Sequence, residues 1–201
     1  MDSDSSDPAA RTPLLSTADN AMKIVVVGGF GVGKTTLVGS VSEIRPLTTE
    51  EVMTRAGVGV DDPSAVRQKR STTVAFDFGR ITLSPESVLY LFGAPGQERF
   101  WFLWDRLFTG ALGAVVLLDD RRLDESWYAI DRLEHHGTPF VVARNTFEPP
   151  RHSLAQIREA LDLSPGVPLL DCDARRRESG KQVLIELVQH LCTRAELEAT
   201  P

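Results

Sequence analysis

Apolar residues gather in short runs, which polar or glycine-rich segments separate along the chain. The first run, residues 22–27, is rich in β-branched side chains and is typical of a buried strand. A helical period follows over residues 35–43. Runs of strand type and helix type then alternate toward the end of the chain. They predict strands at 72–83, 87–92, 113–119, 140–145 and 167–171, and helices at 100–108, 124–135, 153–161 and 180–194.

Residues 45–71 show no steady period and contain two prolines and two glycines. This composition predicts a long connection, with one helical turn expected at 49–55. Loops of this length inside a domain usually serve a function. The two strands that follow are separated by a Ser-Pro-Glu turn, which predicts an antiparallel hairpin.

The alternation of strands and helices predicts an α/β fold with a doubly wound, six-stranded sheet. Five strands are expected to be parallel, and one antiparallel strand is expected at an edge. Ligands of such sheets bind beyond the carboxyl ends of the strands. Ser153 followed by Gln156 predicts a capping box. We expect a disordered acidic tail at 1–20, one domain at 21–196 and a short tail at 197–201.

A glycine-rich segment, GGFGVGKTT, directly follows the first strand and precedes the first helix. Its G-x-x-x-x-G-K-[ST] spacing is that of the phosphate-binding loop of P-loop NTPases. A plain glycine turn is the competing interpretation, and the flanking strand and helix disfavour it. Lys34 is expected to reach the β- and γ-phosphates, and the Thr35 hydroxyl to ligate Mg²⁺. The candidate nucleotide-binding residues here are Gly28, Gly29, Phe30, Gly31, Val32, Gly33, Lys34, Thr35 and Thr36.

Composition narrows the functional classes. A net charge of −6 and an isoelectric point near 5.3 disfavour bulk affinity for nucleic acid or anionic membranes. Cys172 and Cys192 form neither a metal-binding spacing nor a disulfide framework, which suits a reducing compartment. From the sequence we expect neither a signal peptide nor a transmembrane span. We therefore expect a cytoplasmic protein that reaches membranes only through partners.

Two further segments, STTVAFDFG at 71–79 and GAPGQE at 93–98, resemble switch I and switch II of Ras-like small GTPases. The resemblance spans about residues 22–195. It implies that Thr73 binds Mg²⁺ and the γ-phosphate, that the Gly96 N–H contacts that phosphate, and that Gln97 orients the attacking water.

More specifically, the chain is similar to the conservon GTPases of actinobacteria and, more distantly, to the gliding-motility GTPase MglA. The stretches TTVAFDFGR, LFGAPGQERF, AVVLLDDRRL and DARRRESGKQVLIELVQHL carry this resemblance. It implies a switch that hydrolyses GTP slowly without an activator and uses GTP/GDP and Mg²⁺. It also implies a roadblock/LC7-type regulatory partner, with a pentapeptide-repeat protein or a sensor-kinase-like membrane protein as further partners.

The magnesium site departs from the Ras-like pattern. An aspartate heads the switch II motif of that family and holds a magnesium-bound water, whereas this chain has Gly93. The expected metal ligands are therefore Thr35 and Thr73, because Mg²⁺ commonly keeps several waters and needs few protein ligands. Weaker Mg²⁺ binding in the diphosphate state is expected.

The base-recognition segments are altered too. Where the family has N-K-x-D and S-A-K, this chain has NTFE and DAR. By the resemblance, Glu148 accepts the two guanine protons and the Ala174 N–H reaches guanine O6; plain loop residues are the alternative. The candidate base-binding residues are Asn145, Thr146, Phe147, Glu148, Asp173, Ala174 and Arg175.

Arg70 lies three residues before Thr73, the spacing of a built-in arginine finger in heterotrimeric G-protein α subunits, or it belongs to a solvated basic run. Gln97, Lys34 and Arg70 are thus the candidate catalytic residues. The aromatic run 100–104 predicts either a partner surface or packing on a neighbouring helix. Arg121 and Arg122 are expected to be solvated.

Three functions are consistent with these residues. The first is a GTP-hydrolysing switch. The second is an adaptor that holds nucleotide with little turnover. The third is a P-loop ATPase in which Asp119, at the end of an apolar strand, serves as the magnesium acid.

Overall fold

The computed structural model describes residues 20–45, 47–54 and 71–199. Arg70 and all but the last residue of the expected N-terminal tail lie outside this part. The described strands are β1 (Asn20–Val27), β2 (Leu47–Thr54), β3 (Ser71–Ser84), β4 (Ser87–Gly93), β5 (Gly113–Leu118), β6 (Phe140–Asn145) and β7 (Leu169–Cys172). The helices are α1 (Lys34–Val41), α2 (Trp104–Phe108), α3 (Trp127–His136), α4 (Leu154–Ala160) and α5 (Arg177–Ala199), with 3₁₀ turns at Glu98–Leu103 and Leu123–Ser126.

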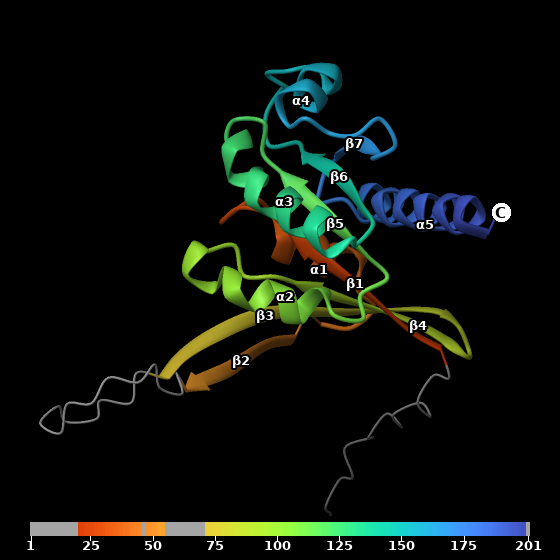
Figure 1. The fold of residues 1–201 in the computed structure, drawn as a ribbon. Helices are drawn as coiled ribbons and strands as arrows, with labels where there is room; N and C mark the ends of the chain where they lie inside the picture. The colour runs from red at the N-terminus through yellow and green to blue at the C-terminus, as the bar shows by residue number, and fades with distance from the viewer. Residues whose placement is uncertain (1–19, 46, 55–70, 200–201) are drawn as a thin grey trace, which may run out of the picture.

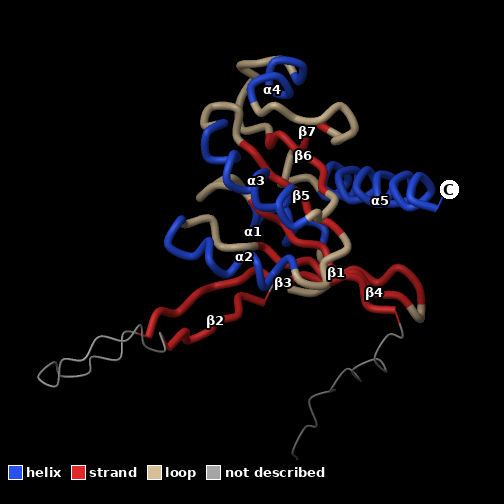
Figure 2. Tube along the Cα trace, in the orientation of Figure 1, coloured by secondary structure: helices blue, strands red, loops and turns tan. Residues whose placement is uncertain are grey.

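One sheet carries the fold, with strand order β2-β3-β4-β1-β5-β6-β7 and helices on both faces (Figures 1 and 2). Strand β1 pairs in parallel with β4 and β5, and the parallel pairing continues through β6 to β7. Among the described strands, β3 alone runs opposite to the rest, and it pairs antiparallel with both β2 and β4. The predicted α/β class, with a mostly parallel sheet and one antiparallel strand, is confirmed.

Strand β2 was not predicted from the sequence. The helical turn expected at 49–55 is wrong, because residues 47–54 pair with β3 from Leu47 opposite Phe78 to Thr54 opposite Ser71. The antiparallel strand β3 therefore lies one place in from the edge. The partners of an edge strand come from a distant segment, so local periodicity does not reveal the pairing. The β2–β3 pair projects past the other strands (Figure 1).

Two apolar layers sandwich the sheet. Alternate residues of β1 point to opposite faces: Ile24 and Val26 join the layer under α1 and α5, whereas Val25 and Val27 join the layer under α2, α3 and α4. Covering both faces explains why the central strands read as continuous apolar runs. The carboxyl ends of these strands are left free to carry loops.

The aromatic run 100–104 packs mostly inward. Trp104 is 1% exposed, and the Trp101 ring stacks on Tyr128 at 3.8 Å between centroids, whereas Phe102 is 56% exposed. Packing on the neighbouring helix α3 is thus confirmed for Trp101 and Trp104. Phe100 and Leu103 are instead buried with Phe76 of β3. The capping box is also present, since the Ser153 hydroxyl accepts from the Gln156 N–H. Within the described ranges, no helix has the length and apolar character needed to span a bilayer.

A substitution at Leu133 of α3 tests the apolar layer between the sheet and helices α2, α3 and α4. The Leu133 side chain is 0% exposed, so Leu133→Ala is expected to lower the free energy of unfolding by about 2–5 kcal/mol. Urea denaturation measures this loss. The matched control, Ile185→Ala on α5, truncates a side chain that is 48% exposed and should change stability by less than about 1 kcal/mol. Equal losses in the two variants would contradict the assigned core.

Candidate nucleotide-binding site

The glycine-rich loop wraps the space between the end of β1 and the start of α1. Gly31 and Gly33 have φ angles of 74° and 102°, which side chains other than glycine rarely adopt. Gly33 is also the N-cap residue, directly before helix α1. This conformation turns backbone N–H groups and the positive end of the helix dipole toward one point, which is how proteins bind phosphate.

Lys34 lies at the centre of this loop and is only 8% exposed. Its Nζ atom donates to the carbonyl oxygens of Gly28 at 2.8 Å and Gly29 at 2.6 Å. Burial lowers the pKa of Lys34 to about 8, and the negative charges of Asp77 and Glu125 oppose that shift. The lysine therefore presents a desolvated ammonium group, which gains strongly from contact with an anion.

A cleft of about 480 Å³ opens above the loop. Its walls come from the loop itself, from Asp77 on β3 and from residues 93–97, which begin at the last residue of β4. The structure thus brings the candidate residues Lys34 and Gln97 to one cleft. The other predicted residues that line it are Phe30, Gly31, Gly33, Thr35, Thr36 and Gly96.

Gly96 packs directly on the phosphate-binding loop. A Cβ atom at this position would lie 2.6 Å from the Lys34 Nζ atom and 2.7 Å from the Gly29 carbonyl oxygen, so only glycine fits without movement. The next side chain, Gln97, accepts at Oε1 from the Arg99 Nε atom at 2.8 Å. The loop after β4 is therefore in contact with the lysine that is expected to bind phosphate.

Asp77 is the site residue that the sequence did not reveal. Its Oδ2 atom accepts from the Thr35 hydroxyl at 2.6 Å, within the cleft. Thr73 lies four residues along β3 from Asp77, which is about 13 Å in an extended strand. Its backbone pairs opposite Val52, and its role in metal binding stays a prediction.

Asn145 connects the loop to the opposite side of the site. Its Nδ2 atom donates to the Val32 carbonyl at 3.0 Å, and its Oδ1 atom accepts from the Ala174 N–H at 3.0 Å. The N–H that was expected to reach guanine O6 is thus already bonded to Asn145. Beside it, exposed Arg175 pairs with Asp173 at 2.8 Å.

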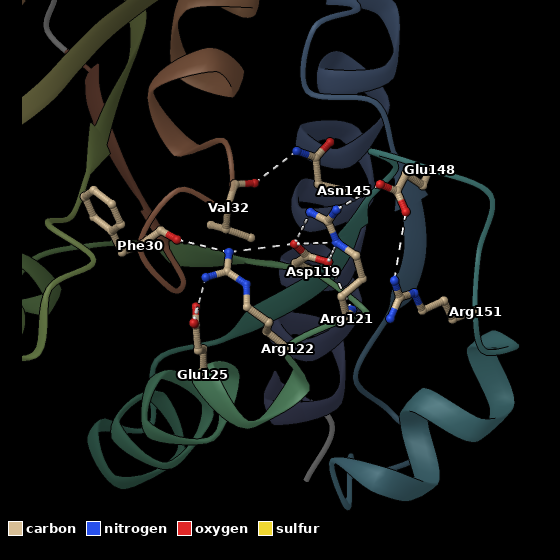
Figure 3. A network of polar contacts seen from close by, with 9 residues as sticks. All are labelled: Phe30, Val32, Asp119, Arg121, Arg122, Glu125, Asn145, Glu148 and Arg151. Atoms are coloured by element: carbon tan, nitrogen blue, oxygen red, sulfur yellow. Dashed lines mark hydrogen bonds and ion pairs between the residues drawn. The ribbon is translucent and has the colours of Figure 1, made fainter.

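Arg121, in the turn after β5, links Asp119 at the end of that strand to Glu148 in the loop after β6, as Figure 3 shows. It pairs with Asp119 at 2.6 Å and with Glu148 at 3.3 Å, and its guanidinium lies 5.0 Å from the centre of the Phe147 ring. Arg121 is exposed, as expected, but its guanidinium is also ion-paired, which the sequence did not predict. Asp119 is buried at the strand end and requires a counter-charge. The Arg121 hydrogen bonds lower the pKa of Asp119.

Arg122 also has partners rather than only water. It pairs with Glu125 at 2.8 Å and donates to the Phe30 carbonyl at 3.2 Å (Figure 3). The turn after β5 is thereby attached to the phosphate-binding loop. Sequence periodicity contained no signal for either arginine, because their partners lie in other loops.

The fold and the loop define a P-loop nucleotide-binding protein with a fold of the GTPase G-domain type. A family model described as "Conserved hypothetical ATP binding protein" matches residues 26–194, and the chain belongs to this family.

One curated relative and one solved structure illustrate the likeness. The chain is 33% identical over 126 residues to "Uncharacterized protein MJ1339" of Methanocaldococcus jannaschii, a match covering 62% of this chain and 69% of that protein. It is similar to the crystal structure of the G domain of the T. maritima FeoB iron transporter, with a TM-score of 0.58 and 16% identity. That match covers 85% of this chain and 99% of the G domain, and at this identity it shows the fold alone.

The lowered pKa of Lys34 makes nucleotide binding depend on pH. Above pH 8 the free protein loses the Lys34 proton, whereas phosphate oxygens hold the ammonium form, so binding takes up a proton. We expect nucleotide affinity to fall roughly tenfold from pH 7 to pH 9. Titration calorimetry in buffers of different ionisation enthalpy measures the uptake. Constant affinity without proton uptake over this range would contradict the lysine's assigned role.

Proposed function

We propose that the protein is a guanine-nucleotide-binding switch that hydrolyses GTP to GDP. The observation that supports this most directly is the packing of Gly96 on Lys34. A γ-phosphate that draws the ammonium group away from the carbonyls of Gly28 and Gly29 must change the surroundings of Gly96. The loop after β4 is therefore placed to respond to the phosphate, which is the requirement of a switch.

Each site residue has a role in this proposal. Lys34 exchanges its two carbonyl partners for phosphate oxygens, and the Gly96 N–H donates to the γ-phosphate. Gln97 leaves Arg99 to orient the attacking water. Mg²⁺, when bound beside the Thr35 hydroxyl, supplies positive charge to the β- and γ-oxygens. Thr73 reaches this point only if the end of β3 rearranges, which makes the β2–β3 pair the second responsive segment.

Guanine selectivity rests on the loops after β6 and β7. Glu148 accepts the two guanine protons, and Asn145 holds its loop against the Val32 carbonyl and the Ala174 N–H. The Glu148 carboxylate is already paired with Arg121. A bound base therefore either donates to Glu148 while the ion pair persists or replaces Arg121 as the partner of Glu148. The Phe147 ring beside Arg121 provides an apolar surface for the base.

ATP hydrolysis is the second candidate, and the family description, which names ATP, favours it. In that hypothesis, Asp119 is the carboxylate that binds Mg²⁺. That carboxylate is bonded to Arg121 through both oxygens, at 2.8 and 2.6 Å, and does not belong to the residues that line the cleft. We therefore favour GTP. The bond between Gln97 and Arg99 is consistent with slow turnover, which the adaptor alternative also expects.

The resemblance to conservon GTPases supports the proposal of protein partners. A roadblock/LC7-type protein would act near Gln97, where the exposed Phe30 and Phe102 rings offer apolar contacts. A pentapeptide-repeat protein or a sensor-kinase-like membrane protein remains the further expectation.

Base selectivity is tested by thermal denaturation with GDP and with ADP. At 100 times its Kd, GDP should stabilise the fold by about 2.7 kcal/mol and raise the Tm by roughly 5–10 °C. ADP at the same concentration should produce little shift. Lys34→Ala should abolish the GDP shift. Equal shifts with both nucleotides would remove the guanine assignment but leave the phosphate site intact.

Hydrolysis is tested by single-turnover kinetics with GTP. Gln97→Leu should lower the rate at least roughly tenfold and leave GTP affinity within about twofold, because the glutamine acts on water rather than on bound nucleotide. The neighbouring Glu98→Gln serves as the matched control and should retain the rate. If Gln97→Leu hydrolyses GTP at the wild-type rate, a residue other than Gln97 must orient the attacking water.

A further inference from the structure

Asp77 occupies the place that a side chain at position 93 would take. The antiparallel register puts Asp77 of β3 directly opposite Gly93 of β4. Side chains at such paired positions share one face of the sheet. A Cβ atom at Gly93 would lie 2.9 Å from the Asp77 Cβ atom and 3.0 Å from its Oδ2 atom. A side chain at 93 and the present Asp77 cannot both be accommodated without movement.

The Asp77 carboxylate also has the contacts expected beside a metal ion. Its Oδ2 atom accepts from the Thr35 hydroxyl at 2.6 Å. That bond uses the hydroxyl proton and leaves lone pairs of the Thr35 oxygen for a cation. Asp77 acts electrostatically on Lys34 and lines the same cleft. Within the described part of the chain it takes part in no ion pair, so its charge is not neutralised by an arginine as that of Asp119 is.

We propose that Asp77 supplies, from the neighbouring strand, the magnesium-site carboxylate that position 93 lacks. It accepts a hydrogen bond from the Thr35 hydroxyl, which leaves the hydroxyl oxygen able to bind Mg²⁺, and it would accept a second hydrogen bond from a water on that ion. Carboxylates near Mg²⁺ commonly act through its waters. Asp77 is thus a positioning residue for the metal, and the inference rests on the proposed nucleotide site.

The carboxylate of the magnesium site thus lies on the β2–β3 pair and not on the loop after β4. A carboxylate at position 93 would stand at the head of the loop that carries Gly96 and Gln97. Asp77 instead belongs to β3, the strand that also contains Thr73 and pairs with β2. Mg²⁺ binding therefore depends on the position of β3, whereas the loop after β4 packs on Lys34 and the Gly29 carbonyl of the phosphate-binding loop.

The test measures how strongly Mg²⁺ retains GDP. The dissociation rate of a fluorescent GDP analogue is recorded against free Mg²⁺ concentration, with excess EDTA as the zero point. Asp77→Asn keeps the size and an acceptor for Thr35 but removes the charge. We expect it to raise the Mg²⁺ concentration for half-maximal retention at least about tenfold. The rate in EDTA should stay within about twofold of wild type.

Two further variants sharpen the result. Asp131→Asn, the same chemical change on an exposed residue of α3, should match wild type. The double variant Asp77→Gly with Gly93→Asp returns a carboxylate to position 93 and removes the side chain that obstructs it. It should recover most of the Mg²⁺ response, which a merely structural role of Asp77 would not predict. If Asp77→Asn fails to fold, Asp77→Ser takes its place in the same measurement.

Each outcome decides the proposal. An unchanged Mg²⁺ response in Asp77→Asn, with wild type still binding GDP and Lys34→Ala not, would overturn the role of Asp77 and leave the proposed function standing. Failure of the wild-type protein to bind GDP at all would overturn both.

Discussion

The ammonium group of Lys34, held away from water against two backbone carbonyls, is the interaction on which the rest of the site depends. A desolvated cation is unfavourable unless it is compensated, and in this loop the compensation comes from dipoles rather than from a formal negative charge in direct contact. Phosphate oxygens offer that charge. The loop, the start of α1 and the lysine therefore form one positive site that favours a polyphosphate.

Three segments from separate parts of the chain converge on this lysine. Gly96 contacts it from the loop after β4, Asp77 acts on it from β3, and Glu125 acts on it from the turn after β5. Each segment follows or lies near the carboxyl end of a central strand, which is where the parallel sheet gathers its loops. In the proposed switch, a change at the phosphate therefore reaches several loops through this one side chain.

The far side of the loop is held by Asn145, which connects the Val32 carbonyl to the Ala174 N–H. This connection gives the phosphate-binding loop and the proposed base site a common support. Arg121 and its two acids complete the base side with an ion-pair network that sequence spacing does not imply. The two halves of the site accordingly differ in character, since one is built from backbone and the other from side-chain charges.

The sequence predicted what depends on neighbouring residues. The phosphate-binding loop, the capping box at Ser153 and the parallel strands have local signatures in spacing and period. The sequence missed what depends on pairing between distant segments. Strand β2 acquires its partners only from β3, Asp77 reaches the cleft through its register with Gly93, and Arg121 is fixed by Glu148. The resemblance assigned metal binding to Thr73, which lies on β3 four residues before Asp77.

Hydrogen exchange of the protein loaded with GDP or with a non-hydrolysable GTP analogue tests the central claim most directly. The account predicts that residues 93–99 and the β2–β3 pair exchange more slowly in the triphosphate state, while the α4 region is unchanged. Identical exchange of both segments in the two nucleotide states would contradict a switch that senses the γ-phosphate through Lys34.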